Sequence, residues 1–335
     1  MAQDLEPDAI GDLHVPVLLD DVLNLLAPAF TGRETAWMVD GTLGMGGHTE
    51  AVLEAFPNVR VIGIDRDPQA IRLASKRLEK FGDCFVAVQE TYDHIDEVVA
   101  GQGLESVDAI LMDLGVSSLQ LDDDERGFSY SRPAPLDMRM NQSAGLTAAD
   151  ILAEWNESEI ARILRVYGEE RFAKRIATRI VEARKTAPIA DSVELAELVR
   201  DAIPAATRRS GGHPAKRTFQ ALRIAVNDEL TILETAIPVA LSTLRVGGRL
   251  VVEAYQSLED RIVKSIFKQG SEVDAPLDLP ILPEDVEEPA LKLITRRAIQ
   301  ADEDAIVDNP RSQSVRLRAV EINKPYQPQT PRSSR

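Results

Sequence analysis

Short, almost wholly apolar runs alternate with amphipathic segments up to about residue 130. The amphipathic segments Thr49–Phe56 and Pro68–Phe81 predict helices, and Asp67 supplies an N-cap for the second. The apolar runs predict four strands, at Ala36–Val39, Val59–Ile64, Cys84–Val88 and Asp108–Met112. Strands that are apolar on both faces and alternate with crossover helices predict a parallel, doubly wound α/β sheet.

The pattern then changes twice. From Leu146 to Arg217 only helical periodicity is present, with four amphipathic helices predicted at Thr147–Leu152, Glu157–Val166, Glu170–Arg184 and Ser192–Asp201. The α/β pattern resumes with a long helix, a strand, a helix and a closing antiparallel pair, at Thr218–Leu244, Arg249–Ala254, Leu258–Lys268, Ala290–Ile299 and Ser314–Ile322. We therefore expect residues 1–140 and 218–324 to form one α/β domain and residues 141–217 a helical domain inserted into it.

Composition indicates a soluble protein of the cytoplasm. The chain has 335 residues, of which 44% are hydrophobic, and contains no apolar run long enough to span a membrane. Its amino terminus is acidic and lacks the pattern of a secretory signal. The single cysteine, Cys84, has no partner for a disulfide, and the scattered histidines predict no metal site. Residues 272–289 are acidic and proline-rich, which predicts a loop, and residues 325–335 are expected to be a disordered tail.

The net charge of −17 is unevenly distributed. Residues 162–217 contain 13 lysines and arginines against 7 acidic residues, a balance of +6, whereas the rest of the chain carries −23. Clustered basic residues are the usual means of binding nucleic acid, so the negative net charge does not exclude a nucleic-acid partner for this segment. An ordinary solvated helix face is the alternative interpretation.

A glycine-rich stretch, Val39–Thr49, follows the first predicted strand and precedes a helix. Glycines at such a point permit a sharp turn and a close approach of the backbone to a ligand. The spacing is not the dinucleotide-binding G-x-G-x-x-G, which disfavours a nicotinamide-dependent oxidoreductase. A tight turn without a ligand is the alternative.

Acidic residues end the second and fourth predicted strands. Asp65 lies 21 residues after Gly44, and a carboxylate there can accept both hydroxyl hydrogens of a ribose above the sheet. A capping or turn role is the alternative for Asp65. Asp113 borders the same crevice and is placed to touch both a cofactor and an acceptor. Together with the glycine turn, these carboxylates predict an adenosine-like ligand.

The segment from Leu119 to Met140 combines charged residues with Phe and Met and follows neither helical nor strand periodicity. This composition favours a functional loop over a structural loop held by ion pairs. Asp137 within it is the second candidate, after Asp113, for a carboxylate that accepts a proton during catalysis.

Long motifs recur along the chain in a fixed order, at His14–Leu19, Asp40–Thr42, Gly46–His48, Ile64–Pro68, Asp113–Ser118, Leu136–Met140, Tyr167–Arg171, His213–Arg223 and Ser257–Arg261. In these motifs the sequence resembles the RsmH/MraW family of ribosomal RNA small-subunit methyltransferases. The resemblance extends from His14 to Lys268 and more weakly to Ile322.

The resemblance implies a class I (Rossmann-like) methyltransferase sheet and S-adenosylmethionine as methyl donor. It also implies N4-methylation of one cytidine in the decoding region of 16S ribosomal RNA, for which we favour the assembled small subunit as substrate. By motif, the implied cofactor contacts are Gly46, Gly47, His48, Asp65, Asp113 and Gln120. Tyr92 follows the third strand, where relatives often have Phe, and its ring is expected to lie against adenine.

The chain departs from the expected pattern at two points. Tyr255-Gln256 replaces the common Phe-His before Ser257–Arg261, so a histidine at position 256 cannot perform acid–base work here. The Asp/Asn-Pro-Pro-aromatic motif of amino-group methyltransferases is replaced by Asp113–Val116. Nitrogen specificity is therefore implied by the family resemblance alone.

Two other function classes remain open at the level of sequence. A nicotinamide-dependent oxidoreductase would also use Asp65 on a ribose, although the glycine spacing counts against it. A ribosome-assembly factor that only senses S-adenosylmethionine would bind RNA without turnover. The oligomeric state is left open.

Overall fold

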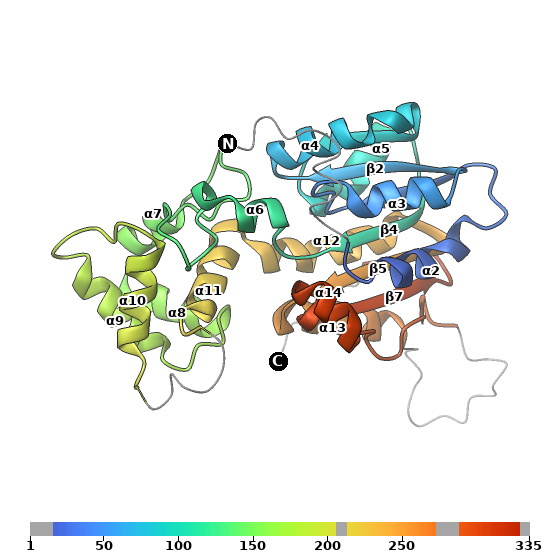
Figure 1. Ribbon diagram of the computed structural model, residues 1–335. Helices are drawn as coiled ribbons and strands as arrows, with labels where there is room; N and C mark the ends of the chain where they lie inside the picture. Colours follow the sequence, from blue (N-terminus) through green and yellow to red (C-terminus); the bar gives the residue numbers. More distant parts are fainter. Residues whose placement is uncertain (1–15, 206–212, 273–287, 329–335) are drawn as a thin grey trace, which may run out of the picture. The chain divides into compact units, whose positions relative to one another are not determined.

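The computed structural model describes residues 16–205, 213–272 and 288–328, and the chain divides into two compact units (Figure 1). One unit contains the sheet and comprises the chain up to Gly115 and again from Thr231. The other, the helical unit, comprises Val116–Leu230. It extends beyond the expected insertion, 141–217, because apolar residues of the preceding loop, such as Phe128 and Met138, pack into its core.

The sheet has seven strands in the order β3-β2-β1-β4-β5-β7-β6. The strands are β1 Ala36–Asp40, β2 Val59–Asp65, β3 Phe85–Gln89, β4 Val107–Asp113, β5 Leu244–Ala254, β6 Leu291–Leu293 and β7 Arg316–Ile322. The first five are parallel, and β7 pairs antiparallel with both β5 and β6. This topology confirms the predicted α/β sheet of a class I methyltransferase and the predicted closing antiparallel pair.

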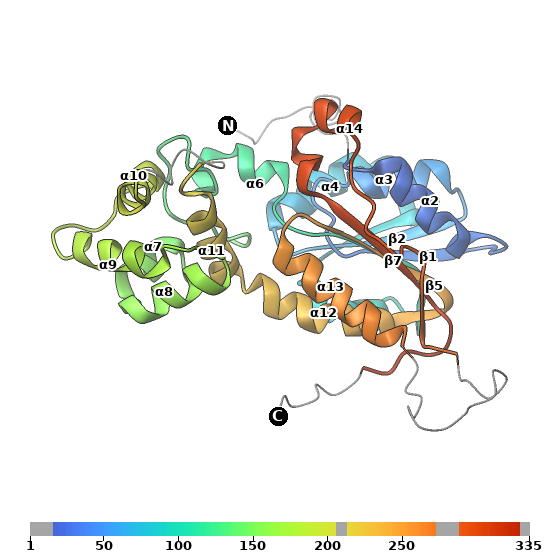
Figure 2. The same ribbon diagram turned by 90° about the horizontal axis from the view of Figure 1, so that it is seen from below.

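Helices cover both faces of the sheet (Figures 1 and 2). Along β4, Ile110 and Met112 enter one apolar cluster, whereas Ala109 and Leu111 enter another, because successive side chains of a strand point to opposite faces. The first cluster is covered by α5 Ile95–Gly101, α12 Glu229–Thr243 and α13 Ser257–Gly270. The second is covered by α2 Leu19–Phe30 and α3 Gly47–Ala55, and α4 Pro68–Leu78 adds a small cluster of its own.

The helical unit has a separate core. Its helices are α6 Ser118–Asp122, α7 Ala148–Glu154, α8 Glu157–Val166, α9 Ala173–Ala183, α10 Ser192–Ala202 and α11 Lys216–Asn227. Side-chain caps start several of them: Asn156, for example, accepts the backbone N–H of Glu159, and the Glu159 carboxylate accepts that of Asn156. The four helices predicted between Thr147 and Asp201 are confirmed, with small differences at their ends.

Other elements differ from the sequence prediction. The single long helix expected over Thr218–Leu244 is wrong: Asp228, at φ 51°, adopts the left-handed conformation and separates α11 from α12. The helix after Asp67 begins as predicted, with the Asp67 side chain accepting the Gln69 N–H, but it ends at Leu78. Helices α2 and α5 were not predicted. Most of the acidic segment 272–289 and of the tail 325–335 lies outside the described residues.

Within the part of the chain that the structure describes, none of the helices combines the length and apolar character that crossing a membrane requires.

Candidate functional site

Four carboxylates line the carboxyl edge of the sheet, where parallel strands place ligand sites. Asp40, Asp65 and Asp113 are the last residues of β1, β2 and β4, and Glu253 is the penultimate residue of β5. Asp113 and Glu253 are directly opposite each other in the β4–β5 register. The predicted carboxylates Asp65 and Asp113 therefore share one edge with two more acidic residues.

The glycine-rich turn between β1 and α3 is held by hydrogen bonds from both strands beside it. The Leu43 N–H donates to the carbonyl of Ile64 at 2.9 Å, and the Gly41 N–H to that of Leu111 at 2.9 Å. Asp40 accepts the Thr49 hydroxyl at 2.7 Å and the Thr42 N–H at 3.2 Å. The turn is thus fixed in place by its own strands and by a buried carboxylate.

Asp65 links the turn to β2. One of its oxygens accepts the Gly44 N–H at 2.8 Å and the other accepts the Asp67 N–H at 2.8 Å. Burial raises the pKa of Asp65 to about 6. The turn role given above as an alternative is therefore present, but each carboxylate oxygen keeps a second lone pair that can accept a ribose hydroxyl.

Gly46 and Gly47 are required by local packing. Gly46 has φ 78°, and a Cβ added there would lie 2.9 Å from Cδ1 of Leu78. A Cβ on Gly47 would lie 2.9 Å from Cγ of Pro16. Substitution at either position would force the turn or the neighbouring side chain to shift, and at Gly46 it would also strain the backbone.

Tyr92, the first residue of a 3-10 turn after β3, is half-buried. A Cβ built on Gly41 would lie 3.4 Å from the Cβ of Tyr92, so this aromatic residue lies beside the end of β1. The predicted aromatic contact for an adenine thus belongs to the same edge as the carboxylates.

Asp113 is held in place by two hydroxyl groups. Its backbone N–H donates to Oγ1 of Thr42 at 2.5 Å, and its carboxylate accepts a hydrogen bond from the Tyr255 hydroxyl. Burial raises the pKa of Asp113 to about 6, and the Tyr255 hydrogen bond opposes this shift. Of the side chain, 30% remains exposed. Asp113 is therefore a base of near-neutral pKa that a ligand can reach.

His48 lies behind Asp113, in the first turn of α3. Its Nδ1 is 3.8 Å from Oδ2 of Asp113, and its Nε2 is 3.5 Å from Oε2 of Glu253 and 3.3 Å from the carbonyl oxygen of Val17. The ring is nearly buried, and burial lowers its pKa. The imidazole thus stands between two carboxylates, each of which faces a different ring nitrogen.

Glu253 was missed by the sequence analysis, which treated Arg249–Ala254 only as a strand. Its side chain is fully buried, and neither carboxylate oxygen has a hydrogen-bond partner among the described residues. Burial and the nearby charge of Asp113 raise its pKa well above the ordinary value. A charged residue within an otherwise apolar run was the available signal.

His48, Asp113 and Glu253 offer ligand atoms within 4.8 Å of one another, a spacing that a divalent cation could bridge. A carboxylate oxygen also lies within 3.8 Å of each imidazole nitrogen, so the same spacing brings the three groups into range for proton exchange.

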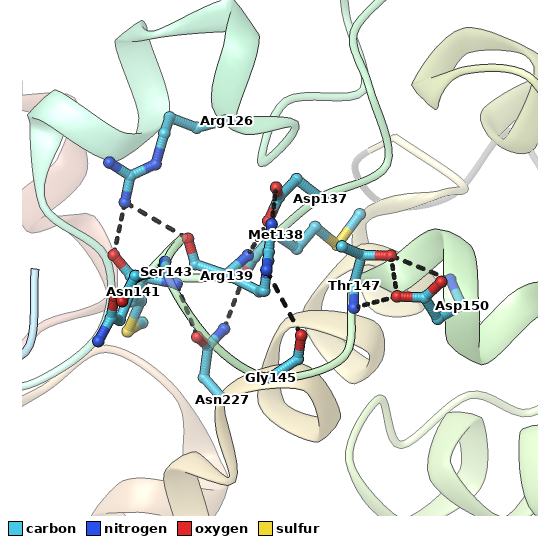
Figure 3. A network of polar contacts seen from close by, with 11 residues as sticks. Arg126, Asp137, Met138, Arg139, Asn141, Ser143, Gly145, Thr147, Asp150 and Asn227 are labelled. Carbon is cyan, nitrogen blue, oxygen red and sulfur yellow. Dashed lines mark hydrogen bonds and ion pairs between the residues drawn. The ribbon is translucent and has the colours of Figure 1, made fainter.

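Gln120 and Asp137 belong to the helical unit, and both are engaged locally. Gln120 forms a capping box at the start of α6, in which its Oε1 accepts the Ser117 N–H at 3.2 Å. Both oxygens of Asp137 accept hydrogen bonds from the Arg139 guanidinium at 2.8 Å, which lowers the pKa of Asp137 (Figure 3). An ion-paired carboxylate of lowered pKa is a poor proton acceptor.

The loop around Asp137 is built on buried polar side chains (Figure 3). Arg126, only 2% exposed, donates to the carbonyl of Met140 at 2.7 Å. Asn227 at the end of α11 donates to the carbonyl of Met138 and accepts the Met140 N–H. Met138 has φ 60°, which these bonds hold in place. The alternative of a structural loop stabilised by ion pairs therefore describes this part of the segment.

Several basic residues of the predicted nucleic-acid-binding segment, 162–217, are exposed. They include Arg171, Lys174, Arg175 and Arg179 around α9, and Lys216 and Arg217 at the start of α11. Arg208 and Arg209 of the same segment lie outside the described residues.

A family model described as the MraW methylase family matches residues 12–323 of the chain. The chain belongs to the MraW methylase family. A relative from Nocardioides sp., named "Ribosomal RNA small subunit methyltransferase H", is 57% identical over 311 residues that cover 93% of this chain and 97% of the relative. A relative of the same name from Kocuria rhizophila is 55% identical and covers 92% of this chain and 94% of its own.

Among solved structures, a putative rRNA-methylase from Clostridium thermocellum aligns with a TM-score of 0.42 at 12% identity, covering 92% of this MraW methylase and 100% of that chain. The resemblance noted in the sequence motifs is confirmed by the family match and by the relatives. The match spans both units of this MraW methylase, so the helical unit is part of the family's common length.

Proposed function

We propose that this protein transfers a methyl group from S-adenosylmethionine to N4 of one cytidine in the decoding region of 16S ribosomal RNA. Membership of the MraW methylase family and 57% identity to a ribosomal RNA small subunit methyltransferase H support the substrate class. The observation that carries the chemistry is Asp113, a ligand-accessible carboxylate with a pKa of about 6 at the carboxyl edge of the sheet.

The residues at this edge fit the proposed cofactor. Asp65 keeps lone pairs for ribose hydroxyls, Tyr92 offers an aromatic surface, and the turn through Gly46 and Gly47 brings backbone close to the ligand. His48 and Asp113 complete the contacts in this unit, and Gln120 is included because the family motif carries it. When bound, S-adenosylmethionine supplies an electrophilic methyl group on a sulfonium.

The protein has two tasks in the reaction. It must align the acceptor nitrogen with the methyl group in the absence of water, and it must accept the proton that the amino group loses. The lone pair of cytosine N4 is delocalised into the ring, so a carboxylate that accepts an N4–H hydrogen bond increases its nucleophilicity. We assign this role to Asp113 and not to Asp137, whose carboxylate is occupied by Arg139.

The exposed basic residues of the helical unit are the proposed contact to RNA phosphates. Lys174 and Arg175 project from α9, and Lys216 from α11. The target cytidine must be unpaired or turned out of its stack to reach the strand edge. Because the chain as a whole is acidic, at −17, we propose that docking requires the assembled small subunit.

The proposal is tested with methyl-labelled S-adenosylmethionine and small ribosomal subunits from cells that lack this gene. Nuclease digestion and mass spectrometry should find N4-methylcytidine at a single decoding-region site. Asp113→Asn should retain the cofactor and lose methylation. Label on another nucleoside would refute the target, and bound cofactor without any label would favour the alternative of an assembly factor that senses S-adenosylmethionine.

A further inference from the structure

Two buried groups at the strand edge have no part in the proton transfer as described so far. His48 is 7% exposed and Glu253 is fully buried, so neither offers much surface to a substrate as large as a nucleotide. Both are nevertheless ionisable, and burying an ionisable group costs free energy unless a partner compensates for the lost hydration. Their common neighbour is Asp113, the proposed proton acceptor.

The surroundings of His48 determine its tautomer. Nε2 faces the carbonyl oxygen of Val17 at 3.3 Å and Oε2 of Glu253 at 3.5 Å. A carbonyl can only accept a hydrogen bond, so Nε2 is the nitrogen that carries the hydrogen in the neutral ring. Nδ1 is then left with a lone pair, 3.8 Å from Oδ2 of Asp113.

In this tautomer no hydrogen lies between Nδ1 of His48 and Oδ2 of Asp113. A lone pair on Nδ1 and an ionised Oδ2 repel each other, which agrees with their separation of 3.8 Å. A proton placed between them would convert this contact into a charge-assisted hydrogen bond. Catalytic hydrogen bonds are often long in the free enzyme and shorten in the reacting complex.

Asp113, His48 and Glu253 form a row in which the exposed fraction of the side chain decreases from the first to the last. Asp113 is 30% exposed, His48 7% and Glu253 0%, so only Asp113 can meet the acceptor and only Asp113 can return a proton to solvent. Burial and the charge of Asp113 favour the protonated form of Glu253, so Asp113, the more exposed carboxylate, is the one placed to ionise. Among the described residues, the other titratable groups that act on this row are Asp21, Asp40 and Tyr255.

We propose that His48 shares with Asp113 the proton that leaves the acceptor nitrogen, and that Val17 and Glu253 hold the imidazole in the tautomer that can do so. This inference rests on the proposed methyl transfer. The N4 lone pair forms the bond to the methyl carbon while the S–CH3 electron pair returns to sulfur. The N4 proton passes to Asp113, is shared with Nδ1 of His48, and leaves through Asp113 after the product departs.

The first test does not depend on activity. The chain has four histidines, so 15N-histidine NMR spectra can be assigned by comparison with His48→Gln and His94→Gln. His48 should be the Nε2–H tautomer at pH 8 and should gain a proton at Nδ1 on acidification. Asp113→Asn should lower the pKa of His48, because the partner that shares the proton is gone. An Nδ1–H tautomer, or an unchanged His48 titration in Asp113→Asn, would overturn the proposal.

The second test measures single-turnover methylation with saturating cofactor. His48→Gln keeps an N–H donor for the Val17 carbonyl but removes the basic nitrogen. Its rate should fall about 10–100-fold. The pH at which its rate is half-maximal should move down from the wild-type value, because a proton on Asp113 is no longer shared with Nδ1 of His48.

If His48 had only a structural role, replacing it would not change how the methylation rate depends on the D2O content of the solvent. In mixtures of H2O and D2O, the wild-type rate should indicate two protons in motion and the His48→Gln rate only one. His94→Gln, at a histidine whose side chain is 45% exposed in the same unit, is the matched control and should behave as the wild type.

The outcomes separate the two proposals. A wild-type protein that methylates no RNA would refute the proposed function, and the NMR titration would still decide whether His48 and Asp113 share a proton. Methylation by His48→Gln at the wild-type rate, with an unchanged pH profile, would refute the shared proton and leave the proposed function intact.

Discussion

Glu253 is the clearest case of a side chain whose energetics depend on its protonation. In the folded protein its pKa lies well above the ordinary value of 4.5, whereas unfolding restores that value. The stability that the protonated group contributes is complete below about pH 4.5 and is lost as the pH rises through its folded-state pKa.

Glu253→Gln should therefore become more stable than the wild type as the pH rises. The amide keeps the shape of the protonated carboxyl but has no proton to lose on unfolding. We expect equal melting temperatures at pH 4 and an increase of about 2–4 °C for the variant at pH 8. Calorimetry at pH 4 and pH 8 measures these melting temperatures. If the variant differed from the wild type by the same amount at both pH values, the raised pKa of Glu253 would be contradicted.

Asp137 illustrates a residue that serves structure rather than chemistry. Its bidentate pair with Arg139 is half-buried and lies in a loop with a strained Met138. Asp137→Asn should lower the free energy of unfolding by about 1–3 kcal/mol and leave the pH dependence of single-turnover methylation unchanged. Urea unfolding and pH–rate profiles test both parts. A shift of the acidic limb of the pH–rate profile would instead indicate that Asp137 takes part in proton transfer.

The sequence predicted Asp65 and Asp113 because residues that end parallel strands must meet at one edge. It could not predict that His48 lies between Asp113 and Glu253, since that depends on how α3 packs against β4 and β5. It also could not distinguish Asp137 from a catalytic carboxylate, because the spacing of Asp137 and Arg139 does not reveal whether their side chains pair.

Among the elements, the loop between α6 and α7 is the most constrained by a single glycine. Gly127 has φ 72°, and a Cβ there would lie 1.9 Å from the carbonyl oxygen of Pro135. Gly145 in the same unit has φ 87° but nothing within 4 Å of a Cβ. An alanine at either position would therefore strain the backbone, but only at position 127 would its Cβ also clash with another atom.

Gly127→Ala should destabilise the helical unit by about 3 kcal/mol or more, since it adds a backbone clash to the cost of the left-handed conformation. Gly145→Ala should cost only about 1–2 kcal/mol. Urea unfolding followed by circular dichroism compares the two variants. Equal losses would mean that the loop can move to accommodate the clash.

Helix α9 is the element through which RNA binding can be tested. The paired substitution Lys174→Ala with Arg175→Ala removes two exposed cations and no buried contact. The slope of log K against log salt for binding to small ribosomal subunits should decrease by about 1.4–1.8, because each phosphate contact contributes 0.7–0.9. Arg72→Ala, an exposed cation on α4, is the control and should leave the slope unchanged. An unchanged slope in the paired variant would identify this face as merely solvated.

At the scale of the molecule, the two units have separate apolar cores and should unfold separately. Scanning calorimetry should resolve two transitions. The demethylated cofactor product at 100-fold its dissociation constant should stabilise the sheet unit by about 2.7 kcal/mol. An unchanged transition of the sheet unit would contradict binding of this product at the carboxyl edge of the sheet.

The α/β sheet and the helical unit could largely be predicted from the sequence, because apolar strand runs and helical periodicity differ sharply on either side of residue 140. The boundaries of the helical unit could not be predicted as well. Phe128 and Met138 are spaced without periodicity, and only packing shows that they belong to the core of the helical unit. The break at Asp228 depends on one left-handed residue within a continuous helical pattern.

The insertion between β4 and β5 also has a consequence for synthesis on the ribosome. These two strands are neighbours in the sheet, yet residues 114–243 separate them along the chain. At about 5–20 residues per second, translation needs roughly 7–26 s to pass from one to the other. During this interval β4 is the edge strand of an incomplete sheet, and Glu253, which pairs in register with Asp113, has not yet been synthesised. The nascent chain therefore contains its whole helical unit before Asp113 and Glu253 can come together.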